Sequence, residues 1–416
     1  MPTSVLQRHG AGRNGSAGFD TIDTIATAPS ARLIERAERA AAIAEKFADA
    51  VDADARHPAE AVAALREERL LGAMVPAEFG GEGASIPEIA DVCHVLGRAC
   101  ASTGMIFAMH QVKAACLIRH GAGQRAIEAF MRRLAGEQLL IASSTTEGAG
   151  GGNVRSSEGA VEIRGERMTL DRDASVISYG RAADALVTTA RRDATAAHSD
   201  QVLVVVHKDD YALTPTGGWD TLGMRGTVSE GFKLHVDAPR AQVMAVPYAA
   251  IHVQSMVPTA HVFWASVWAG IAAAALEKAR RFVRTVARKS GGTPPPGAVH
   301  LPRAASTLRT LRALIAQSAK DFAARGGDPD AVSALDFQNE ILMLKVEASE
   351  LALQVVLAAM RTAGLAAYRQ DGEFSIARHL RDVMSAPVMI HNDRILANAV
   401  SPSMMAEIPA HLFDHA

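Results

Sequence analysis

The spacing of apolar residues in the first third of the chain is that of amphipathic helices. It predicts one helix from Ala31 to about Val51, a second from Pro58 to Leu71, and three more over about 86–98, 102–121 and 125–134. The third helix has a clear start, because Ser85 precedes Pro87 and Glu88 in the pattern of a capping box. Residues 31–137 are therefore predicted to form an all-α domain.

Beyond Leu139 the period of the pattern changes from that of a helix to that of a strand. Short runs over 160–163, 185–189, 202–206 and 232–236, separated by Gly, Asp and Pro, predict a small β domain over residues 138–248. The helical period returns at about His252. Helices are predicted over 262–287, 302–324, 331–363 and 375–384, with a last segment from 390, which indicates a helical bundle over residues 249–416. The predicted fold class is mainly α with a central β domain.

The composition of the chain argues against nucleic acid and membranes as partners. The chain has 416 residues, of which 49% are hydrophobic, and a formal net charge of −2. This charge provides no bulk attraction to nucleic acid or to an anionic membrane, and we expect no run of about eighteen apolar residues that would cross a bilayer. Residues 1–30 lack an apolar core, which predicts a disordered tail rather than a secretory signal. Cys93, Cys100 and Cys116 lack the spacing of metal ligands, so we expect no metal site and a cytoplasmic location.

The stretch from Leu139 to Gly180 carries the strongest candidates for binding chemistry. An apolar run leads through four hydroxyl residues, Ser143 to Thr146, into a loop with four glycines in five positions, 148–152. Such a loop lets backbone N–H groups approach a flat or anionic ligand, and the hydroxyls can bond its polar edge. A second apolar run ends in Ser178 and Gly180. Either loop alone is more typical of a β-turn, and a Rossmann loop is disfavoured because a strand-like pattern follows it instead of a helix.

Four short motifs, read in order, resemble those of the acyl-CoA dehydrogenase family of flavoproteins. Val75–Gly81 looks like the family's Pro-x-x-Tyr/Phe-Gly-Gly turn, and Thr146–Gly152 looks like its Thr-Glu-Pro-Gly-x-Gly-Ser-Asp loop. Leu222–Thr227 looks like its Leu-Gly-x-Arg-x-(Ser/Thr) segment, and Arg378–Asp382 matches its Arg-x-x-Arg-Asp sequence. The resemblance covers about 31–398. It implies an N-terminal helical domain, a small β-barrel and a C-terminal helical bundle, with FAD between barrel and bundle, usually in a homotetramer.

The resemblance also assigns residues to the flavin ring. It implies that Thr145 and Thr146 face the pyrimidine ring, beside the loop glycines Gly151 and Gly152. It places Ser178 where the family has the hydroxyl that bonds flavin N5. Gly152 stands in place of a serine that contacts the thioester arm of the substrate.

Further assignments concern the rest of FAD and the substrate. Ala363 and Gly364 correspond to the small pair that approaches the FAD pyrophosphate. Arg288 corresponds to the arginine that meets the FAD phosphates across the subunit boundary. His261 stands in place of an arginine that helps to hold the substrate, so the pocket for an acyl-CoA departs from the family pattern.

The family's catalytic glutamate is missing from both places where the family carries it. Those places read Val388–Asp393 and Pro258–His261 in this chain. Because desaturation of a thioester needs a base at the α-proton, Asp393 and His391 are the candidates for this work. In an oxygenase, His110 or His391 would instead manage the proton on a flavin–oxygen adduct. An aspartate near a helix start is more often a cap, and a histidine on an apolar helix face is more often structural. Imidazole exchanges protons near neutral pH, which suits His391.

Three functions are open at this point. The first hypothesis is an FAD-dependent dehydrogenase that desaturates an acyl thioester and passes electrons to an electron-transfer flavoprotein. The second is a flavin monooxygenase of the same fold, with FAD or FMN supplied by a flavin reductase, that oxygenates a small apolar or aromatic substrate. Such monooxygenases also lack the glutamate, use a serine near N5 and carry the Phe-x-x-His sequence seen from Phe107 to His110. The third is a non-catalytic flavin- or thioester-binding relative, which the hydroxyls at the flavin edge disfavour.

Overall fold

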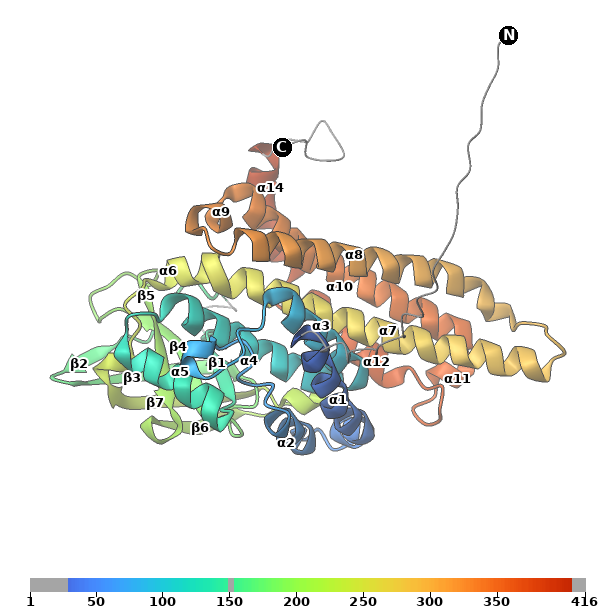
Figure 1. Ribbon diagram of the computed structural model, residues 1–416, viewed down its shortest axis with the longest axis horizontal. Helices are drawn as coiled ribbons and strands as arrows, with labels where there is room; N and C mark the ends of the chain where they lie inside the picture. Colours follow the sequence, from blue (N-terminus) through green and yellow to red (C-terminus); the bar gives the residue numbers. More distant parts are fainter. Residues whose placement is uncertain (1–28, 149–152, 406–416) are drawn as a thin grey trace, which may run out of the picture.

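The computed structural model describes residues 29–148 and 153–405, and it begins with a layer of helices (Figure 1). The elements are α1 (Pro29–Ala53), α2 (Ala59–Glu67), the short η1 (Ala77–Phe79), α3 (Ile86–Ala99), α4 (Ala101–His120) and α5 (Arg125–Glu137). The predicted capping box begins α3, because the Ser85 hydroxyl accepts from the Glu88 N–H and the Glu88 carboxylate accepts from the Ser85 N–H. α2 is shorter than predicted, since Arg69 takes a left-handed conformation with φ 53°. Residues 1–28 of the predicted tail lie outside the described residues.

The central strands form two sheets. The first contains β1 (Ile141–Ser144), β4 (Ala185–Arg191) and β5 (Gln201–His207) in the order β1-β4-β5, with β1 parallel to β4 and β5 antiparallel to it. The second is antiparallel, in the order β2-β3-β7-β6, and contains β2 (Glu162–Arg164), β3 (Arg167–Ile177), β7 (Glu230–Pro239) and β6 (Tyr211–Gly217). Most residues of β6 are exposed, which is why the hydrophobic pattern does not predict it. A bulge lies between Ala174 and Ile177 at the end of β3, directly before Ser178.

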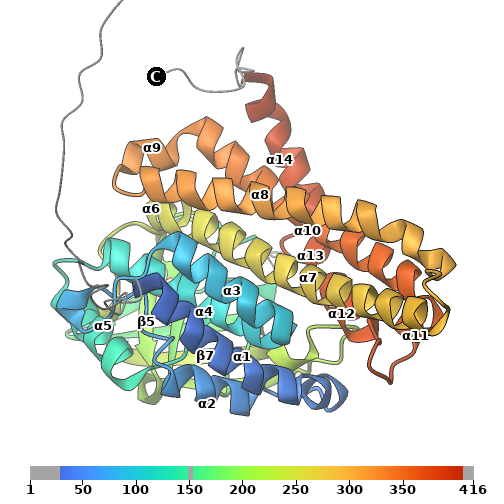
Figure 2. The same ribbon diagram turned by 45° about the vertical axis from the view of Figure 1, so that its right-hand side comes forward.

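Three long helices form the C-terminal bundle. α7 (Val257–Lys289), α8 (Leu301–Arg325) and α10 (Leu335–Ala363) lie side by side in Figures 1 and 2. The shorter elements are α6 (Tyr248–Ile251), the π-helical turn η6 (His252–Met256), η7 (Pro296–His300), α9 (Pro329–Ser333), α11 (Leu365–Tyr368), α12 (Ala377–Val383), α13 (Ser385–Val388) and α14 (Asn392–Met405). The single helix predicted over 331–363 is two helices, because Ala334 is extended, with ψ 140°, between α9 and α10.

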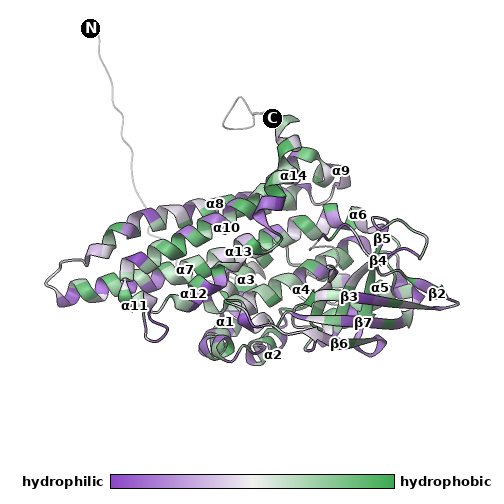
Figure 3. Ribbon diagram, turned by 180° about the vertical axis from the view of Figure 1, so that it is seen from behind, coloured by the Kyte–Doolittle hydropathy of each residue, from purple (hydrophilic) through white to green (hydrophobic). Residues whose placement is uncertain are grey.

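α7 is the helix around which the core is built. It packs against α3 of the N-terminal layer and against α10 of the bundle. A Cβ on Gly270 would lie 2.4 Å from the His94 carbonyl oxygen, so the backbones of α7 and α3 are in direct contact. The span Tyr248–Lys289 does contain an 18-residue window apolar enough to cross a membrane, contrary to our expectation, but 83% of that window is buried inside the protein. Figure 3 shows that α8, by contrast, carries both hydrophobic and hydrophilic residues.

Candidate active site

A cavity of about 820 Å³ lies where the strands, α4 and the bundle meet. One wall comes from the strand ends and their loops and is rich in hydroxyls: Ser143, Thr145, Thr146, Ser175, Ser178, Thr227 and Ser229. A second wall comes from α4, η6 and α7: Met105, Met109, Val112, Lys113, His252, Met256, Val257, His261 and Trp264. The third comes from the segment around α12 and α13: Arg381, Met384, Val388, Met389, Ile390, His391 and Arg394. The cavity is therefore polar on its strand side and mainly apolar on its helix side.

Three hydroxyls of the strand wall form a hydrogen-bonded series. Ser178 Oγ lies 2.8 Å from Ser229 Oγ, and Ser229 Oγ lies 2.8 Å from Thr227 Oγ1. The Thr227 hydroxyl donates to the Met224 carbonyl oxygen at 2.8 Å. Since each hydroxyl has one proton, Ser229 donates to Thr227 and Ser178 donates to Ser229. In this arrangement the Ser178 hydroxyl can only accept a hydrogen bond from a group in the cavity. If the three hydroxyls reverse their direction of donation, Ser178 donates to that group instead.

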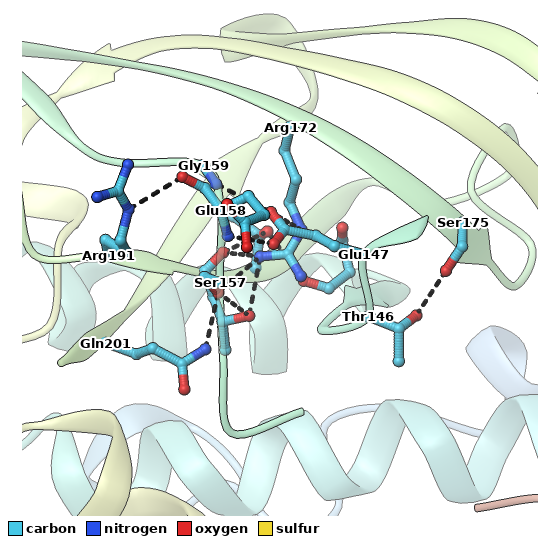
Figure 4. A network of polar contacts seen from close by, with 12 residues as sticks. Thr146, Glu147, Ser157, Glu158, Gly159, Arg172, Ser175, Arg191 and Gln201 are labelled. Atoms are coloured by element: carbon cyan, nitrogen blue, oxygen red, sulfur yellow. Dashed lines mark hydrogen bonds and ion pairs between the residues drawn. The ribbon is translucent and has the colours of Figure 1, made fainter. Parts of the chain in front are cut away.

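The loop that carries Thr145 and Thr146 is fixed by a buried ion pair. Glu147 follows them, and its carboxylate accepts two backbone N–H groups and lies 3.5 Å from Arg172 Nε. Figure 4 shows Arg172 beside Glu147. The Arg172 side chain is fully buried, and its Nη1 donates to the carbonyl oxygen and the hydroxyl of Thr189. Burial lowers the pKa of Arg172 to about 10, and the Glu147 carboxylate opposes that shift. The threonines are therefore held at the cavity by a charge pair behind them.

Two of the sequence motifs meet beside the cavity. The Met224 N–H donates to the Asp382 carboxylate at 2.7 Å. A Cβ on Gly223 would lie 2.0 Å from the Arg381 carbonyl oxygen, so only glycine allows this contact. Burial raises the pKa of Asp382 to about 6, while Arg378 acts in the opposite direction. The motif pair thus joins the β region to the bundle.

The turn that carries His391 is fixed from the bundle. Lys345 of α10 donates to the Ala386 carbonyl oxygen at 3.0 Å and to Asn392 Oδ1 at 2.6 Å. Ile390 and His391 both take left-handed conformations, with φ 60° and 49°. This region is unfavourable for a β-branched residue, so the surrounding contacts must hold the turn in place. His391 is exposed and lines the cavity.

The other two histidines of the cavity wall are uncharged at neutral pH. Burial lowers the pKa values of His252 and His261 to about 4. His261 Nδ1 lies 2.8 Å from the Ile341 carbonyl oxygen, to which it donates when neutral. The cavity therefore contains His261, as the predicted substrate contact requires, but as a neutral group where the family pattern has a charged one.

His110 lies outside the cavity wall, and the catalytic interpretation of it is not supported. It is fully buried on α4, its Nε2 lies 2.8 Å from the Leu71 carbonyl oxygen, and its Nδ1 accepts from the Ile141 N–H at 3.1 Å. Burial also lowers its pKa to about 4. Both ring nitrogens are occupied by backbone groups, so His110 ties α4 to β1 and to the segment after α2.

Asp393 is also absent from the described residues that line the cavity. It is exposed in the first turn of α14, where a negative charge interacts favourably with the helix dipole. This placement favours the helix-start role over the catalytic one. No Asp or Glu occurs among the described residues of the cavity wall.

The remaining predicted residues lie elsewhere or outside the described chain. Arg288 is exposed near the end of α7, and Ala363 and Gly364 end α10. Arg288 follows Trp264 of the cavity wall by 24 residues of α7, which at ~1.5 Å per residue places it roughly 36 Å from Trp264 along the helix. Gly151 and Gly152 lie outside the described residues.

Sequence reasoning missed Lys113, which lines the cavity and is only 4% exposed. Its Nζ donates to Met256 Sδ at 3.4 Å, and a thioether is a weak acceptor. A signal was present in the sequence, because Lys113 is the only Lys, Arg, Asp or Glu between residues 101 and 118. A lone lysine in such an apolar helix requires an explanation, since lysine is almost never buried without a partner.

Replacing Lys113 with methionine is expected to stabilise the folded protein at pH 7. Burial lowers the pKa of Lys113 from 10.5 to about 8. The cost of burying the charge is complete below pH 8, declines as the folded state loses its proton, and vanishes above 10.5, where both states are neutral. The variant should gain roughly 1–4 kcal/mol in unfolding free energy at pH 7. Urea unfolding at pH 7 and pH 10 measures this, and a gain independent of pH would contradict it.

A cavity between a hydroxyl-lined sheet edge and a helical bundle is the arrangement that the sequence motifs led us to expect. Residues 32–138 match the family model "Acyl-CoA dehydrogenase, N-terminal domain", and residues 259–404 match "Acyl-CoA dehydrogenase, C-terminal domain". The chain belongs to the acyl-CoA dehydrogenase family, as its motifs predicted.

Curated relatives of two kinds are similar to the chain. Cyclohex-1-ene-1-carbonyl-CoA dehydrogenase of Geobacter metallireducens is 26% identical over 78% of this chain and 84% of its own length. Dibenzothiophene monooxygenase of Rhodococcus erythropolis is 28% identical over 54% of this chain and 55% of its own length. The crystal structure of FMN-bound TdsC from Paenibacillus sp. A11-2 has a TM-score of 0.79 at 18% identity, and covers 91% of this chain and 98% of TdsC. Both curated relatives are oxidoreductases, and so is this chain.

The described residues of the cavity fit FAD, the cofactor of the family. Thr145, Thr146 and Ser178 all line the cavity, and the hydroxyl chain behind Ser178 can present either a donor or an acceptor. Bound flavin supplies the two-electron chemistry that protein side chains lack. The individual contacts of these three residues with the ring stay predictions.

Ser178→Ala is expected to keep the fold and to slow flavin reduction or reoxidation by tens-fold. The variant removes the end of the hydroxyl chain, and one oriented hydrogen bond contributes ~1–3 kcal/mol. Stopped-flow absorbance of the bound flavin measures the rates. Thr221→Val, at a cavity hydroxyl that donates to the Gly223 carbonyl oxygen and not to Ser178, Ser229 or Thr227, is the control. Equal rates for Ser178→Ala and the wild type would refute the assignment.

Proposed function

We propose that this chain is a flavin-dependent monooxygenase of the acyl-CoA dehydrogenase family. The observation that carries the proposal is the absence of any carboxylate among the described residues of the cavity wall. Desaturation of a thioester needs a base beside the α-carbon, and the family uses a glutamate there. Oxygenation of an apolar substrate needs an apolar pocket and a proton source. The described wall offers the apolar pocket and a proton source that oxygenation needs, but not the carboxylate base that desaturation uses in this family.

His391 is the residue to which we assign the proton transfers. It is the exposed histidine of the wall, whereas His252 and His261 are held neutral by burial. The anchored turn fixes its position, and imidazole can both give and take a proton near neutral pH. Ser178 acts at the flavin edge, because its hydroxyl chain adapts to a donor or an acceptor on the ring.

A desaturating dehydrogenase is the second candidate. The similarity to cyclohex-1-ene-1-carbonyl-CoA dehydrogenase favours it, because that similarity covers 84% of the relative's length. In that case His391 would be the base, the substrate an acyl thioester, and the electron acceptor an electron-transfer flavoprotein. For the monooxygenase the partners are a small apolar or aromatic substrate, O₂ and a flavin reductase, and a cytoplasmic location stays a prediction in both cases.

One experiment separates the two candidates. The protein is loaded with FAD or FMN, reduced anaerobically with dithionite, and mixed with O₂ or with an anaerobic ferrocenium salt. For the oxygenase we expect a new absorbing flavin species that outlasts mixing with O₂ and then decays. Direct return to the oxidised spectrum, with fast oxidation by ferrocenium, indicates the dehydrogenase. Failure to bind either flavin at micromolar concentration contradicts both.

The far end of the bundle supports assembly into a homotetramer with shared cofactor sites. Arg288 and Gly364 lie at that end, and Arg288 is roughly 36 Å along α7 from Trp264 of its own cavity wall, which favours contact with the cofactor of a second copy. If they bind FAD phosphates, they bind those of a second copy. Val299, Leu365 and Tyr368, near this end, are 74%, 74% and 72% exposed, which favours a partner there. Sedimentation with and without FAD tests this.

A further inference from the structure

The cavity holds a buried positive charge that nothing in the described chain neutralises. Lys113 extends from α4 into the wall, and the wall contains no carboxylate among the described residues. Its hydrogen bond to Met256 Sδ leaves at least two of its three N–H donors for a ligand. A buried charge without a counter-ion is costly and is retained in proteins mainly where it has a function.

The titratable groups around Lys113 do not supply a negative charge at neutral pH. Cys116, on the same helix, has a pKa that burial raises to about 11. From η6 and α6, His252 is neutral and Tyr248 has a pKa that burial raises far above neutrality. The other charged group on this side, Arg155, is itself positive and acts on His252 and Tyr248. The missing negative charge must therefore come from what enters the cavity.

We propose that Lys113 binds an acidic oxygen of the substrate, a carboxylate or a phenolate carried on a small apolar body. The inference rests on the proposed function in one respect: the substrate occupies this cavity. The apolar body fits the apolar side chains of the same cavity wall, which include Met105, Met109 and Val112 of α4. Methionine adapts to flat or irregular apolar groups, so this part of the wall accepts a ring.

The π-helical turn contributes to the site. η6 interrupts the regular helix between α6 and α7 and brings both His252 and Met256 into the cavity wall. Met256 Sδ accepts from Lys113 Nζ at 3.4 Å and from the Tyr248 hydroxyl at 3.3 Å. An anion can replace the weak thioether acceptor at Lys113 without breaking any stronger hydrogen bond of the protein. π-helical turns occur frequently at functional sites.

The test compares two probes of nearly equal shape, benzoate and its neutral analogue benzamide. Each is titrated into the flavin-loaded oxidised protein, and binding is followed by calorimetry and by the flavin absorbance. We expect benzoate to bind about tenfold or more tightly than benzamide at pH 7. The preference should fall as the pH rises above 8, because Lys113 loses its proton. Equal binding of the two probes, or no benzoate binding at about 10 mM, overturns the proposal.

Variants assign the effect to Lys113. Lys113→Met should abolish the preference for benzoate, and Lys113→Arg should retain part of it. Lys46→Met makes the same substitution at an exposed lysine of α1 and should leave the preference unchanged. A preference that survives in Lys113→Met overturns the proposal. A difference between the flavin spectra of ligand-free Lys113→Met and the wild type also overturns it, because that result would place the Lys113 amine against the cofactor.

The outcome is independent of the choice between oxygenase and dehydrogenase. Probe binding is measured without turnover and without O₂ chemistry, whereas the reoxidation experiment needs no substrate. A benzoate preference lost in Lys113→Met, together with dehydrogenase-like reoxidation, keeps the anion site and rejects the oxygenase. Equal binding of benzoate and benzamide, together with oxygenase-like reoxidation, rejects the anion site and keeps the oxygenase.

Discussion

Arg172→Met should lower the free energy of unfolding by about 3–5 kcal/mol, because it leaves Glu147 as a buried charge without its partner. The side chains of Arg172 and Glu147 are 0% and 5% exposed, so water cannot replace the lost contact. Chemical denaturation followed by circular dichroism measures the loss. Because Glu147 adjoins the threonines at the cavity, affinity for FAD should fall in parallel.

Two further variants make this prediction specific. Arg167→Met on the same strand removes an exposed pair with Asp237, and we expect a change of about 0–1 kcal/mol. Adding Glu147→Gln to Arg172→Met should recover part of the stability, because the remaining side chain is then neutral. If Arg172→Met unfolds at the same denaturant concentration as Arg167→Met, the buried pair does not hold the loop.

His391→Ala should slow the proton-dependent steps of flavin reoxidation by about 10²–10⁴-fold, as removal of a positioned acid–base group does. Flavin binding should persist, because His391 belongs to a turn anchored through Lys345 and Asn392 rather than through its own side chain. Stopped-flow mixing of the reduced protein with O₂ over a range of pH measures the rates.

Asp393→Asn is the matched control for His391→Ala. The two residues are two positions apart, but Asp393 does not belong to the described cavity wall. We expect its rates to stay within about twofold of the wild type. Loss of activity in Asp393→Asn together with normal rates in His391→Ala would restore Asp393 as the base and would argue for the desaturating dehydrogenase.

Hydrophobic periodicity predicted the fold well wherever one face of an element is buried. The capping box at Ser85 fixed the start of α3 because both of its hydrogen bonds are local. The pattern failed where burial does not alternate: β6 is mostly exposed, and Ala334 breaks a helix without a Gly or Pro signal at that position. Such breaks are decided by packing rather than by the residue itself.

The site was only partly readable from the sequence, for a related reason. Thr145, Thr146 and Ser178 line the cavity as predicted, since they follow directly from strand ends. His110 and Lys113 lie three residues apart on one helix, yet only Lys113 reaches the cavity, while both nitrogens of His110 meet backbone groups. Which face of α4 meets the cavity depends on how the helix packs, and an almost entirely buried helix has no polar face to reveal it.

The anchoring of the His391 turn has a consequence for how new chemistry arises in this fold. Lys345 anchors the turn by donating to the Ala386 carbonyl oxygen and to Asn392 Oδ1. Asn392 Nδ2 also donates to Ser349 Oγ at 2.9 Å. None of these contacts uses the side chains of residues 388–391, which line the cavity. Substitutions there can change the reaction while the scaffold keeps its stability. Mutational drift at four adjacent positions therefore offers a short evolutionary route between desaturating and oxygenating enzymes.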